Sequence, residues 1–174
     1  MRRVWIWNAL IRAILAIALQ LLVFNNLYLG TVLNPTIYVY IIIFLPLETP
    51  FLLLILLGFI LGFIEDMALG TWGLHMMAAT LIAYTRWRLI KVLEPRDGYE
   101  AGIQPKLYDF GWGPYLTYSL TSVFLFSIFL YLVESLGTIG LWRIIFMALM
   151  NTTVVVFLIV VFEIMRKKSN RGNG

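Results

Sequence analysis

The residues best suited to chemistry in this 174-residue chain are Glu65, Asp66 and His75, the only histidine. A carboxylate–histidine group can relay protons or hold a cation. Two adjacent acids and one histidine are too few for a persuasive catalytic set, and the sequence has neither a Ser-His-Asp arrangement nor a glycine-rich phosphate loop. We therefore expect no catalytic residue, metal site or cofactor. The three residues should cap helix ends at a water-facing outer loop, with ion binding as the open alternative.

Composition places the chain in a membrane. Hydrophobic residues make up 61% of the sequence, and the mean hydropathy is +0.90. These values exclude an ordinary water-soluble domain. A spanning helix needs roughly 20 apolar residues, so the length has room for about six spans. The chain has no cysteine, which excludes disulfides, thiol catalysis and cysteine-based metal sites.

Six hydrophobic segments predict an all-α membrane protein, a bundle of six transmembrane helices in one domain, 1–166. The predicted helices cover about 5–29, 35–47, 50–64, 74–92, 114–133 and 141–165. Asn34-Pro35 and Thr49-Pro50 each combine a helix cap with proline at the first helical position. The second and third helices are short, which favours a tilted or kinked hairpin. The first helix is too long for a signal peptide and should be retained. Residues 167–174 should form a basic tail without fixed structure.

Basic residues indicate the orientation. With both termini in the cytoplasm, twelve of the 13 lysines and arginines lie inside and only Arg143 lies outside. All six tryptophans fall near predicted span ends, as in an aromatic belt. Orientation and anionic lipid therefore account for the net charge of +4, and no nucleic-acid partner is expected.

Small residues mark two candidate packing faces. One is a stripe on the first helix and the other a small-xxx-small pair on the third. These residues are Ala9, Ala13, Ala16 and Gln20, then Gly58 and Gly62. Either face can serve packing within the bundle or docking of a partner helix, and both interpretations stay open.

A charged loop follows the fourth predicted helix. It contains Arg96, Asp97 and Tyr99, and Asp97-Gly98 is a turn signal. This mixture suits a cytoplasmic protein contact, and a solvated connector is equally compatible with it.

Four segments carry a resemblance to a known family. They are NPTIYVYIIIFLPLETP, GFILGFIEDMALGTWGLH, AATLIAYTRW and PRDGYE, in that order. Together they resemble the rod shape-determining protein MreD family in its Bacteroidetes form, over about Leu19 to Glu100. The last two helices are similar only in hydropathy.

The resemblance implies a non-enzymatic scaffold of the bacterial inner membrane. Such a protein partners the bitopic protein MreC and links MreB filaments to the cell-wall synthases that make peptidoglycan. It also implies a fold similar to the substrate-binding S-components of energy-coupling-factor transporters. A vitamin-transport subunit of that kind is the alternative function.

Overall fold

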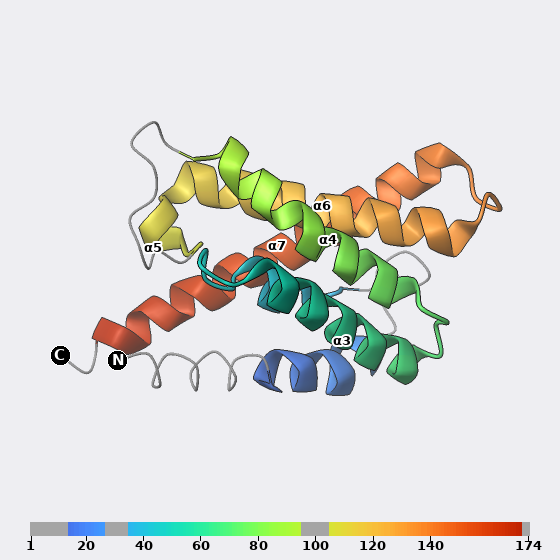
Figure 1. Cartoon of the computed structure of the whole chain (residues 1–174), viewed down its shortest axis with the longest axis horizontal. Helices are drawn as coiled ribbons and strands as arrows, with labels where there is room; N and C mark the ends of the chain where they lie inside the picture. Colours follow the sequence, from blue (N-terminus) through green and yellow to red (C-terminus); the bar gives the residue numbers. More distant parts are fainter. Residues whose placement is uncertain (1–13, 27–34, 95–104, 172–174) are drawn as a thin grey trace.

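The computed structural model describes residues 14–26, 35–94 and 105–171. Within these ranges the chain forms six α-helices and no strand (Figure 1). The helices are α2 Val39–Ile43, α3 Phe51–Leu69, α4 Leu74–Val92, α5 Leu107–Phe110, α6 Trp112–Ser135 and α7 Leu141–Arg171. An N-terminal helical segment, Ile14–Asn26, precedes them and ends in the 3-10 turn Phe24–Asn26.

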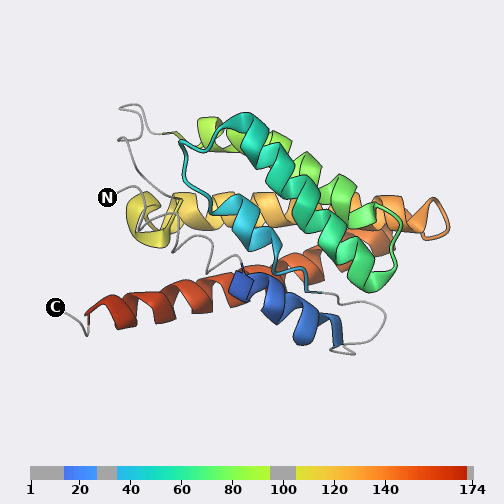
Figure 2. The ribbon, with the colours of Figure 1, turned by 60° about the horizontal axis from the view of Figure 1, so that its bottom comes forward.

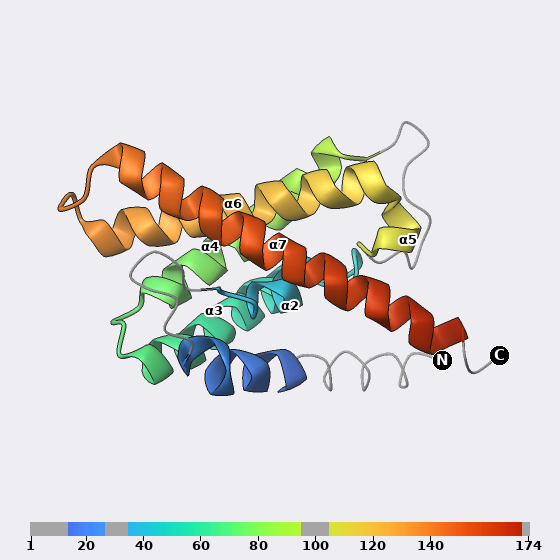
Figure 3. The same ribbon diagram turned by 180° about the vertical axis from the view of Figure 1, so that it is seen from behind.

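The long helices alternate in direction. The α3–α4 and α6–α7 turns lie at one end of the bundle, and α5 lies at the other (Figure 1). Helix α7 runs obliquely across the bundle past α6 and α2 (Figure 3). Among the residues that the structure describes, three helical stretches are long and apolar enough to cross a membrane: Phe51–Leu69, Trp112–Ser135 and Leu141–Met165. They indicate a multi-pass membrane protein.

Helix α4 differs from these three because it carries Arg86, Arg88 and Lys91 within its 19 residues. The face of α4 around Ala79 packs closely on α3. A Cβ atom added to Gly58 would lie 2.7 Å from the carbonyl oxygen of Ala79, and one added to Gly62 would lie 2.4 Å from the Cα of Met76. Glycine is required at both positions because the two backbones approach so closely.

The stretch 35–47, expected to be one short helix, is helical only over Val39–Ile43. This five-residue helix lies between the α3–α4 pair and α7 (Figure 2). Val39 and Ile42 are completely buried. The Tyr38 ring meets the Phe126 ring edge-on at a centroid distance of 5.8 Å. The backbone on both sides of α2 is not helical. A bundle interior tolerates this because side chains from other helices can bind the backbone N–H and C=O groups that lack helical partners.

Two further boundaries differ from the expected ones. Helix α3 continues through 65–69, where a polar loop was expected, and α7 continues to Arg171 through most of the expected tail. The sequence suggested that Glu65 and Asp66 would end the third helix in water. Both are instead buried, because side chains from other elements bind them.

Candidate functional site

The polar interior of the bundle is organised around α2. On the N-terminal side of α2, Gln20 is completely buried. Its Oε1 atom accepts hydrogen bonds from the backbone N–H groups of Ile37, at 2.7 Å, and Tyr38, at 3.3 Å. Its Nε2 atom donates to the Pro35 carbonyl at 3.1 Å and to Glu65 Oε1 at 3.3 Å. One side chain thus satisfies the backbone on the entry side of α2 and links it to α3.

The C-terminal side of α2 is held by Arg86 and Tyr118. Arg86 donates through Nε to the Ile43 carbonyl at 3.2 Å, and through Nη2 to the carbonyls of Leu45 and Pro46. The Tyr118 hydroxyl on α6 donates to the same Ile43 carbonyl at 2.8 Å. Arg86, one of the twelve basic residues expected on the cytoplasmic side, is only 3% exposed. The charge stays buried because it binds backbone carbonyls that would otherwise lack donors.

Further polar contacts connect the residues before α2 to other helices. The Tyr38 hydroxyl lies 3.1 Å from Nδ1 of His75 on α4. Asn151 on α7 donates through Nδ2 to Ser127 on α6, at 2.9 Å, and to Thr36, at 3.4 Å. The segment from Thr36 to Pro46 is therefore tied by side chains to α4, α6 and α7.

Asp66 fastens the α3–α4 turn. Its carbonyl accepts the N–H groups of Gly70 and Thr71. Its carboxylate accepts from the Thr71 hydroxyl at 2.7 Å and from the first-turn N–H groups of His75 and Met76 at 3.0 and 2.9 Å. Gly70, with φ 70°, supplies the left-handed residue that ends α3. An acid at the end of one helix thus caps the start of the next.

The expected outer cluster does not converge on one point. Glu65, Asp66 and His75 are 2%, 7% and 3% exposed, so the expectation that the two acids face water is wrong. Each turns to a different partner: Glu65 to Gln20, Asp66 to the α4 backbone, and His75 to Tyr38. Within the described ranges, no three metal-ligating side chains gather in a group that could hold an ion.

The remaining sequence-predicted residues divide into two groups. Gln20 faces the interior and Ala16 is partly buried, and Gly58 and Gly62 lie at the α3–α4 contact. Five residues lie outside the described ranges: Ala9, Ala13, Arg96, Asp97 and Tyr99.

Sequence reasoning missed the roles of Arg86, Tyr118 and Asn151. A charged residue six positions before the end of a predicted span is a signal for an internal partner, and Arg86 meets that description. Tyr118 lies between Thr117 and Ser119, and Asn151 precedes two threonines, so the sequence does not show which polar residue of each group has a distant partner. Comparison of the chain with protein-family models, curated proteins and solved structures found no match.

Proposed function

We propose that the chain is a non-enzymatic scaffold of the bacterial inner membrane that acts as MreD-like proteins do. In this role it binds MreC and connects the cell-wall synthases with MreB filaments. The proposal is supported by the partners of the buried polar side chains. Gln20, Arg86 and Tyr118 bind the chain's own backbone around α2. They stiffen the bundle, as a scaffold requires.

The proposal includes six crossings with both termini in the cytoplasm. The stretch 35–47 would be the second crossing. It begins beside Gln20 and Glu65, near the α3–α4 turn, and ends beside Arg86, near the opposite end of α4. Turns with backbone hydrogen bonds flank the five helical residues, so the segment is short for a bilayer core about 30 Å thick, and the crossing fits a locally thin region. A mostly non-helical crossing is compatible with the bilayer because protein surrounds it.

One feature favours a second candidate, a solute-transport subunit. Discontinuous helices near the membrane midplane often form substrate sites in transporters, and α2 is interrupted on both sides. In this chain, however, side chains already occupy the polar groups at both ends of α2. A solute would have to displace them, so we favour the scaffold.

Affinity purification from native membranes distinguishes the two functions. The full chain carries a small C-terminal tag and is extracted in mild detergent. A multi-pass protein of similar size, with the same tag and expression level, is the control. The proposal predicts that MreC and the cell-wall synthases are enriched over the control. An ATPase pair without MreC would support the transport subunit, and absence of MreC at full recovery of the chain would contradict the scaffold role.

A further inference from the structure

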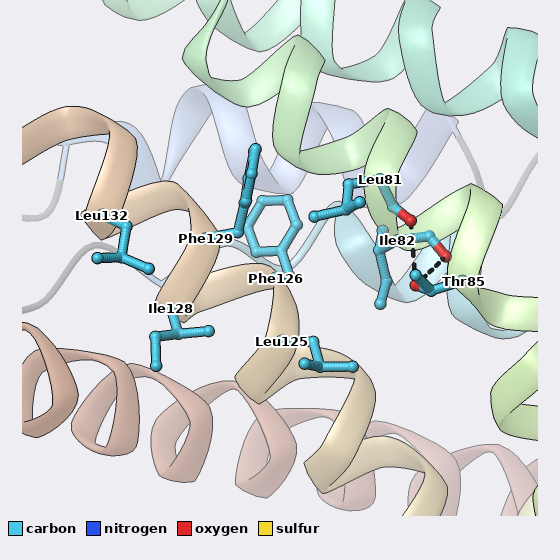
Figure 4. Close-up of a pocket in the computed structure, with 8 residues that line it drawn as sticks. All are labelled: Leu81, Ile82, Thr85, Leu125, Phe126, Ile128, Phe129 and Leu132. Atoms are coloured by element: carbon cyan, nitrogen blue, oxygen red, sulfur yellow. Dashed lines mark hydrogen bonds between the residues drawn. The ribbon is translucent and has the colours of Figure 1, made fainter. Parts of the chain in front are cut away.

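A groove lies between α4 and α6, open to the outside of the bundle (Figure 4). Three residues of α4 line it, Leu81, Ile82 and Thr85, together with five residues of α6 between Leu125 and Leu132. Leu81 and Leu125 are each 36% exposed and form its rim. The groove therefore faces whatever surrounds the bundle in the membrane.

The surface of the groove is apolar. Among the described residues that line it, Thr85 has the only polar side chain, and its hydroxyl donates to the carbonyls of Leu81, at 3.0 Å, and Ile82, at 3.2 Å (Figure 4). Because Thr85 uses its hydroxyl within its own helix, it presents mainly its methyl group. The groove thus suits a hydrocarbon occupant.

The size of the groove favours a single chain. Its volume is about 180 Å³. A narrow apolar groove of this volume has room for a segment of one acyl chain.

A basic residue, Arg88, lies on α4 near one end of the groove. Arg88 follows Thr85 by three residues and Leu81 by seven, which places it on the same face of α4, one turn closer to the end of the helix. Its guanidinium lies over the Tyr84 ring, 5.6 Å from the centroid. Among the described residues, no carboxylate forms an ion pair with it. Charge and apolar surface are thus arranged in the order of a lipid headgroup and its chain.

We propose that the α4–α6 groove and Arg88 together bind one anionic phospholipid, with an acyl chain in the groove and the phosphate at Arg88. Arginine is well suited to phosphate because its planar fork donates two parallel hydrogen bonds. The proposal concerns the membrane-facing side of the bundle and does not depend on the scaffold role.

Native mass spectrometry of the full chain in detergent tests this site. The chain is titrated with phosphatidylglycerol and, separately, with zwitterionic phosphatidylcholine of the same chains. We expect tighter retention of phosphatidylglycerol. Arg88→Gln should weaken the affinity for phosphatidylglycerol about fivefold, which is the usual contribution of one cation beside an anionic lipid. Leu125→Trp, which fills the groove, should weaken the affinity for both lipids about tenfold. That is the effect expected when roughly two methylene groups lose their contacts.

Lys91→Gln is the matched control for charge. Lys91 lies one turn beyond Arg88 and therefore farther from the groove, with its ammonium over the Trp87 ring at 5.9 Å from the centroid. If Lys91→Gln weakens the affinity for phosphatidylglycerol as much as Arg88→Gln does, binding reflects surface charge alone and the proposal is overturned. Leu132→Trp is a second groove-filling variant in case Leu125→Trp does not fold. Unchanged lipid binding in a folded groove-filling variant would also overturn the proposal. So would a photo-crosslinker at position 132 that captures a protein helix in membranes and no lipid.

Discussion

Arg86 on α4 donates a hydrogen bond through Nε to the carbonyl oxygen of Ile43, the last residue of α2, at 3.2 Å. The two residues are 43 positions apart in the chain. Through this contact the buried guanidinium gains a hydrogen-bond acceptor, and the carbonyl at the end of the buried helix gains a donor. The short helix α2 and the buried charge on α4 are therefore one structural feature.

Arg86→Leu should destabilise the bundle by about 3 kcal/mol. It leaves the carbonyls of Leu45 and Pro46 without this donor and weakens the hold on Ile43, and buried groups without partners cost roughly 1–3 kcal/mol each. Denaturant unfolding of the purified chain in detergent measures the change. Arg88→Leu, at an exposed position on the same helix, is the control and should lie within about 0.5 kcal/mol of wild type. Equal effects of the two substitutions would mean that the buried contacts contribute nothing.

Gln20→Leu should cost about 2–3 kcal/mol. Leucine has a similar size but cannot accept from the Ile37 and Tyr38 N–H groups, so both lose this acceptor. Thermal unfolding in detergent checks the loss. Leu22→Ala, on the exposed side of the same segment, should change stability by about 0.5 kcal/mol or less. If Gln20→Leu unfolds at the wild-type temperature, Gln20 does not hold the α2 segment.

Gly62→Ala should destabilise the chain by about 1–3 kcal/mol because the new methyl would overlap Met76 and push α3 away from α4. Gly113→Ala is the matched control, since a Cβ there meets nothing within 4 Å. That control should be neutral or stabilise by up to about 1 kcal/mol. Unfolding of both variants in the same detergent makes the comparison. Similar effects at the two glycines would contradict close packing of α3 on α4.

Asp66→Ala should loosen the start of α4 at a cost of about 1–2 kcal/mol, the usual loss for a helix cap. The amides of His75 and Met76 would lose their acceptors. Hydrogen exchange followed by mass spectrometry should show faster exchange over the first turn of α4. Asp66→Asn keeps one acceptor oxygen and should have a smaller effect. Unchanged exchange in Asp66→Ala would show that the carboxylate is not the cap.

The double variant Asp66→Asn with His75→Gln tests the absence of catalysis by this cluster. The proposed scaffold role predicts cell width close to wild type when the protein level is unchanged, because these groups position backbone and side chains only. Rounded cells at normal protein level would show that the cluster has a further role. Microscopy with parallel quantification of the chain in membranes gives the answer.

Hydropathy and charge are enough to indicate an all-α membrane protein and to place α4 and the start of α7. They do not indicate where a polar residue finds its partner. Glu65 and Asp66 appear to end a helix when only their neighbours in sequence are considered. Glu65 is accommodated in α3 because Gln20, 45 residues earlier, donates to it. The apolar run of 35–47 likewise predicts a helix, and the side chains that stabilise its non-helical ends come from α4, α6 and the N-terminal segment.

Residues 35–47 cross the bundle as a largely buried segment with only one turn of helix. Thiol labelling of three single-cysteine variants tests it most directly, because the chain has no cysteine of its own. Asn26→Cys and Glu48→Cys lie at exposed positions on the two sides of the segment, and Ile42→Cys lies at its buried centre. We predict external labelling at position 26, cytoplasmic labelling at position 48 and protection at position 42 until the protein is unfolded. Labelling of positions 26 and 48 from the same side, or rapid labelling of position 42 in the native protein, would contradict the claim.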